Sequence, residues 1–129
     1  SSNDVSYSGK GIIAYCFHGV DGYSKIGSYT GNASSDGTFI HTGFRPAWVL
    51  VKCSTTVDNW LIMDATRNTY NVINHKLYPN VSDAEADESV LDFTSNGFKW
   101  RNGGSLFNGN ETYVYLAFAE SPFKYSNAR

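Results

Sequence analysis

Eight residues near the end of the chain decide the fold class: Thr112-Tyr113-Val114-Tyr115-Leu116-Ala117-Phe118-Ala119. They are mostly β-branched and aromatic, which is typical of a β-strand. Because side chains alternate across a strand, Val114, Leu116 and Phe118 share one fully apolar face, and tyrosines and alanines share the other. We expect this strand to lie centrally in a sheet, with the apolar face on the core and the second face covered by loops or a neighbouring subunit.

Similar strand patterns precede this stretch, and turn signals separate them. The expected strands are 10–17, 25–30, 38–42, 47–54, 59–64, 90–94 and 98–101. Turns such as Asn96-Gly97 supply the positive φ angles of tight hairpins. About eight short strands predict an all-β domain, an antiparallel β-sandwich of the jelly-roll type. We expect its core to include Ile13, Tyr15, Phe17, Trp48, Leu50, Trp60, Ile62, Val114, Leu116 and Phe118.

The segment from Ser82 to Glu88 lacks the strand pattern. Ser82 as N-cap with Glu85 three residues later forms a capping box, so the segment predicts a short helical turn. Its acidic residues lack the spacing of a calcium loop, and the three histidines lack metal-ligand spacing. We therefore expect neither a metal nor a cofactor.

Composition limits the classes of partner. The chain has 129 residues, which fits one domain spanning 1–129. Charged residues make up only 17%, the net charge is −2, and no basic run is present, so nucleic-acid binding is not expected. No apolar run approaches the ~18 residues of a membrane span. The abundant Ser, Asn and Tyr suit recognition of sugars or assembly with other subunits.

The two cysteines, Cys16 and Cys53, each lie in an apolar strand pattern. Two buried free thiols are the expected state, because free cysteine behaves as a small hydrophobic residue. A disulfide is the alternative, since its geometry cannot be read from sequence.

The segment 70–80 is the best candidate binding site. It offers tyrosine rings for the apolar face of a sugar and amides for its hydroxyls. The side chains expected to contact a saccharide are Tyr70, Asn71, Asn74, His75 and Tyr78. An ordered loop packed by Leu77 and Tyr78, with no ligand, is the alternative.

No pairing of a nucleophile with a base is visible, so no catalytic residue is expected. Twelve acidic residues make some carboxylate pair inevitable, which gives a glycosidase pair little weight. A glycan-active enzyme is therefore only a weak alternative.

Six segments, taken in order, resemble a C-terminal domain of unknown function found in virion proteins of tailed bacteriophages, especially marine and cyanobacterial ones. These segments are 22–32, 42–52, 59–67, 77–80, 95–99 and 117–129. The resemblance implies a virion location, in a tail fibre or other surface appendage, and no catalytic residues. It also implies that the chain is the C-terminal part of a longer protein. Trp100, Asn102 and Asn108 lie where the chain departs from the recognised pattern, and form a second candidate specificity surface.

The expected function is a non-catalytic, distal tail-fibre module that binds a host cell-surface saccharide. The alternative is a structural virion module, for fibre trimerisation or capsid decoration, with no ligand of its own. The excess of Tyr and Phe over what one core can enclose favours self-association. Because fibre proteins commonly form trimers, the expected partners are other copies in a homotrimer and other virion proteins.

Overall fold

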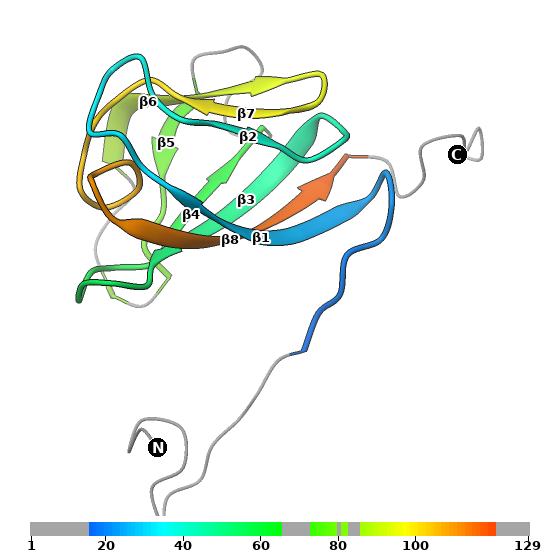
Figure 1. Ribbon diagram of the computed structural model, residues 1–129, viewed down its shortest axis with the longest axis horizontal. Coiled ribbons are helices and arrows are strands. Elements are labelled where there is room, and N and C mark those ends of the chain that lie inside the picture. Colours follow the sequence, from blue (N-terminus) through cyan, green and yellow to red (C-terminus); the bar gives the residue numbers. More distant parts are fainter. Residues whose placement is uncertain (1–15, 66–72, 80, 83–85, 121–129) are drawn as a thin grey trace, which may run out of the picture.

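The computed structural model describes residues 16–65, 73–79, 81–82 and 86–120. In this part, two antiparallel four-stranded sheets pack face to face as a β-sandwich (Figure 1). The first sheet has the order β1 (Ser24–Thr30), β8 (Thr112–Ala119), β3 (Pro46–Cys53), β4 (Leu61–Asp64). The second has the order β2 (Phe39–His41), β7 (Gly97–Trp100), β6 (Ala86–Thr94), β5 (Ile73–Lys76). The prediction of an all-β antiparallel sandwich is confirmed.

Strand β8 lies in the middle of its sheet, as its sequence predicts. It pairs with β1 on one side and β3 on the other, so that Leu116 lies opposite both Ile26 and Leu50. Leu50 in turn lies opposite Ile62 of β4. A continuous row of four aliphatic side chains therefore crosses the first sheet.

Strands β6 and β7 form the hairpin that the Asn96-Gly97 signal predicts, but its two turn residues are Ser95 and Asn96, because Gly97 is the first residue of β7 and pairs with Thr94. Strand β2 runs directly beside this turn. A Cβ atom on Gly97 would lie 2.1 Å from the carbonyl oxygen of Ile40, so glycine is required here by the close approach of β2.

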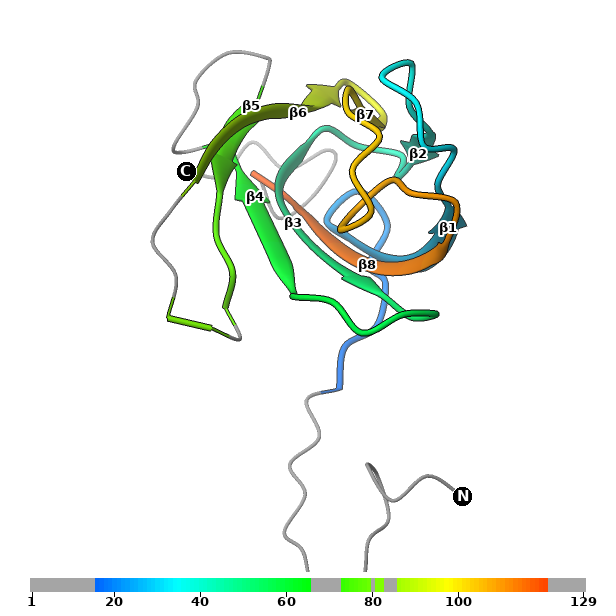
Figure 2. The ribbon, with the colours of Figure 1, turned by 90° about the vertical axis from the view of Figure 1, so that its left-hand side faces the viewer.

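Strands β4 and β5 join the two sheets along one flank (Figure 2). Ile62 and Leu77 exchange backbone hydrogen bonds of 2.9 and 3.0 Å. The sandwich is thereby closed on this side.

Two sequence expectations about secondary structure need correction. The helical turn is wrong for Ala86–Glu88, which begin β6, while residues 83–85 lie outside the described part. The capping box is a local signal, and pairing with β5 overrides it: Ala86 lies opposite Lys76. Of the first expected strand, residues 10–15 lie outside the described part, and Cys16 and Phe17 belong to no strand.

For the first sheet, the sequence assigned the wrong face of the strands to the core. The buried residues of its strands β3, β4 and β8 are Val49, Val51, Cys53, Leu61, Met63, Tyr113, Tyr115 and Ala117. The expected core residues alternate with these and lie on the outer face: Trp48, Leu50, Ile62, Val114, Leu116 and Phe118. Phe17 and Trp60 are exposed, and residues 13 and 15 lie outside the described part. Since both faces of these strands are apolar, alternation alone could not select the buried one.

Tyrosines enter the core because their hydroxyl groups find partners at one end of the sandwich. The Tyr29 hydroxyl donates to the carbonyl of Phe107 (2.5 Å), and that of Tyr113 donates to the carbonyl of Ser105. The two rings stack with centroids 5.2 Å apart. Burial raises the pKa of Tyr29 well above its usual value, so the neutral phenol is the form that the core holds.

Candidate functional site: an apolar groove on the first sheet

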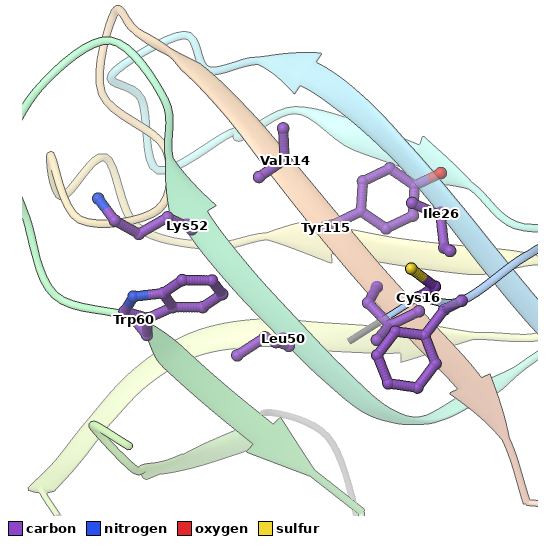
Figure 3. A pocket seen from close by; sticks show the side chains of 9 residues that line it. Cys16, Ile26, Leu50, Lys52, Trp60, Val114 and Tyr115 are labelled. Atoms are coloured by element: carbon purple, nitrogen blue, oxygen red, sulfur yellow. The ribbon is translucent and has the colours of Figure 1, made fainter. Parts of the chain in front are cut away.

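The outer face of the first sheet carries a groove of about 900 Å³, a volume within the range of ligand pockets (Figure 3). Strands β1, β3 and β8 form its floor. Its lining residues are Cys16, Phe17, Ile26, Leu50, Lys52, Trp60, Val114, Tyr115 and Leu116.

The floor follows from the second apolar face of the three strands. Ile26, Leu116 and Leu50 lie in register across β1, β8 and β3. Val114 neighbours Lys52 in the next position along the sheet. Ile26 is 42% exposed and Val114 44% exposed, although each is surrounded by other apolar groups. The floor is therefore an apolar surface in contact with solvent.

Few polar groups reach into the groove. Among the described residues, Lys52 is the only charged one that lines the groove, and its ammonium donates to the carbonyl of Cys53 at 2.8 Å. Trp60, at the start of β4, contributes an indole ring that is 41% exposed. Sugar sites need several convergent hydrogen-bonding groups. The groove therefore suits apolar side chains better than a saccharide.

One wall of the groove is formed by Cys16 and Phe17, which belong to residues 16–19, here called the arm. All four residues of the arm are exposed, and Phe17 is 58% exposed. The arm is anchored where Val20 pairs with Ser24, and the Ser24 hydroxyl donates to the carbonyl of His18 at 3.2 Å. Towards Cys16 the arm leads away from the sandwich in both views (Figures 1 and 2).

The structure describes only part of the predicted saccharide site. Tyr70 and Asn71 lie outside the described residues, whereas Asn74 and His75 belong to strand β5. Tyr78 is half-buried and packs against the core. Saccharide binding by segment 70–80 thus stays a prediction.

The prediction of a second saccharide surface is wrong for two of its three residues. Trp100 and Asn108 are fully buried, so neither side chain is accessible to a saccharide. Trp100 stacks on Phe107 within the core, with centroids 4.7 Å apart. The side-chain oxygen of Asn102 accepts from the backbone N–H of Gly104 at 2.9 Å, which stabilises its own loop.

Neither cysteine forms a disulfide, but the two thiols differ in environment. Cys53 is buried as expected, whereas the prediction for Cys16 is wrong, because it is exposed on the arm. Burial raises the pKa of the Cys53 thiol, but hydrogen bonds with Thr56 (3.1 Å) and Thr55 (3.6 Å) outweigh burial, so the pKa lies below its usual value.

The described residues contain no group of three or more His, Cys, Asp or Glu that could hold a metal ion. Within the same part of the chain, no helix is suited to crossing a membrane.

Sequence reasoning did not identify the groove, although its signal was visible. The stretch 112–119 is apolar on one face and aromatic on the other, and a covering subunit was one expectation for its second face. Because the sequence assigned the two faces of this strand in reverse, it expected the covered face to be the one that carries Tyr113 and Tyr115. Residues far apart in sequence, such as Ile26 and Trp60, share the groove only because of the sheet order.

Residues 1–122 match one protein family, described as a domain of unknown function (DUF7483). No curated protein matches the chain, and no solved structure does.

Proposed function

The chain belongs to the DUF7483 family of unknown function, and from its geometry we propose that it is a non-catalytic assembly module. In this proposal, the groove on the first sheet packs against a second copy of the chain. The observation that carries the proposal is the solvent-exposed apolar floor formed by Ile26, Leu50, Val114 and Leu116.

Physical chemistry favours covering this floor. Contiguous exposed apolar patches mark interaction sites in soluble proteins. Each Å² of apolar surface removed from water stabilises the buried state by roughly 25 cal/mol. Val114, Trp60 and Phe17 are each more than two-fifths exposed, so a covering chain would bury substantial apolar area.

The lining chemistry supports binding over catalysis. The nine described residues that line the groove offer one thiol, one phenol and one ammonium, and no carboxylate or imidazole. General acid–base chemistry needs a titratable group close to the reacting atoms. The single lysine is instead engaged with the backbone of Cys53.

The sequence resemblance to virion domains suggests the setting: a tail fibre or other bacteriophage surface appendage. A homotrimer is the assembly that this setting favours. Host saccharide binding by segment 70–80 would then be a separate property, because none of its described residues, 73–79, lines the groove.

The test is the mass of the protein in solution, by size-exclusion chromatography with light scattering. We expect the wild-type chain to exceed its 14.3 kDa monomer mass and Val114→Asp to be monomeric, because a carboxylate would be buried unpaired in the interface. Val57→Asp is the matched control, since Val57 is fully exposed and does not line the groove. A monomeric wild-type protein, or a Val114→Asp variant of wild-type mass, would refute the proposal.

A further inference from the structure

We propose that the occupant of the groove is residues 12–15 of a neighbouring copy, so that the subunits exchange their N-terminal segments. This inference rests on the proposed function and names the part of the second copy that the groove receives. Each copy would then donate one segment and accept another.

The chemistry of the segment matches that of the groove. Residues Ile12-Ile13-Ala14-Tyr15 are uncharged and mostly aliphatic, and no charged residue lies between Lys10 and Asp21. The floor presents Ile26, Leu50 and Leu116. An extended apolar segment laid on this floor would remove both surfaces from water without burying a charge.

The position at which the described chain begins supports the same occupant. Cys16 and Phe17 already line the groove, so residues 12–15 attach directly to its wall. The Phe17 ring contacts Phe118 edge-on, with centroids 6.4 Å apart, which holds the Cys16 end of the arm on the outer face. A copy packed against this face would therefore lie close to the point where the segment joins the arm.

The family match gives independent support. It begins at residue 1, so residues 1–15 are part of the family's domain. A segment that belongs to the domain is expected to have a place in its folded assembly.

The direction of the arm favours a neighbouring copy over the chain's own groove. Towards Cys16 the arm leads away from the sandwich in both views (Figures 1 and 2). A chain that continues in this direction would reach a neighbouring copy without a turn. A head-to-tail contact, in which each copy gives its segment to the next, is heterologous and closes into a ring when the rotation between neighbours closes. A ring of three copies would form the expected homotrimer.

A mixing experiment tests this exchange. Ile13→Asp removes a competent segment but keeps the groove, and Val114→Asp removes a competent groove but keeps the segment. We expect each variant alone to be monomeric, with association weakened at least about tenfold. Mixed together, they should form a two-chain species, because one intact segment meets one intact groove. Val5→Asp, in the same N-terminal region but outside 12–15, is the control and should assemble like wild type.

The outcomes separate the two proposals. If the wild-type chain is monomeric, assembly itself is refuted. If Val114→Asp is monomeric but Ile13→Asp keeps the wild-type mass, assembly stands and segment exchange is refuted. If both folded variants stay monomeric after mixing, the segment does not bind a neighbour's groove, and exchange is refuted. Circular dichroism checks folding, and Ile13→Ala replaces Ile13→Asp in the mixture if the latter is misfolded.

Discussion

Asn108 shows how one polar residue stabilises a whole end of the sandwich. Its amide is fully buried, and its Nδ2 atom donates to the Oδ1 atom of Asn32 (3.0 Å) and to the carbonyls of Ser34 and Asn102 (3.1 Å each). Two chain segments, 32–34 and the one at Asn102, thus converge on one side chain. The backbone packs equally closely here: a Cβ atom on Gly31 would lie 2.1 Å from the carbonyl oxygen of Gly109.

Replacing this amide should therefore be costly. Asn108→Ala leaves several groups without their partner, and each buried unsatisfied group costs about 1–3 kcal/mol. We expect the free energy of unfolding to fall by at least about 2 kcal/mol in urea titrations. Asn110→Ala is the control, because Asn110 is exposed, and should change stability by less than about 0.5 kcal/mol. Equal effects of the two substitutions would show that the Asn108 network contributes little.

Strand β4 shows how neighbouring residues of similar size face different environments. Leu61 is fully buried between the sheets, whereas Ile62 is half-buried on the outer face. The same alternation runs through β3 and β8, whose outer residues form the groove. Each strand therefore has two apolar faces, of which one is internal to the sandwich.

This difference predicts unequal truncation costs. Leu61→Ala should lower the free energy of unfolding by about 2–5 kcal/mol, because it leaves a cavity in the core. Ile62→Ala should cost clearly less, since the outer face is partly hydrated already. Both are measured by chemical denaturation in the monomeric Val114→Asp background, which removes any contribution from assembly. A larger loss for Ile62→Ala would mean that the faces of β4 are assigned in reverse.

At the scale of the whole molecule, an apolar sheet face is exposed on one side of a closed sandwich. The core is complete without this face, since Trp100, Phe98 and Phe93 are fully buried between the sheets. The fold of a single chain therefore does not require the outer face to be buried. Its exposure is explained if the assembled form contains several chains.

Tryptophan fluorescence should report this assembly. Trp60 is 41% exposed at the groove, whereas Trp100 is fully buried. We expect acrylamide quenching to weaken as protein concentration rises, because a covering chain shields the indole of Trp60. Trp60→Phe should remove this concentration dependence, and Trp48, on the same face, should contribute the smaller remainder. Quenching that is independent of concentration in an oligomeric wild-type protein would place the interface elsewhere.

By itself, the sequence determined most of the strands. The central strand 112–119 and the hairpin between β6 and β7 were predictable because side-chain alternation and the turn preference of Asn are local properties. Strand β5 was not, because segment 70–80 was expected to be a loop. The apolar run of β3 likewise identified a strand. The capping box after Ser82 was equally local, but pairing between β5 and β6 overrode it at Ala86.

Only the tertiary structure decided which face of each strand is buried. Where both faces are apolar, the choice depends on partners distant in sequence. Tyr29 could enter the core because the carbonyl of Phe107, 78 residues away, accepts its hydroxyl. The same choice left Ile26, Leu50 and Leu116 outside, in register across three strands. The groove is thus a product of strand order, because no local pattern brings β1 beside β8 and β8 beside β3.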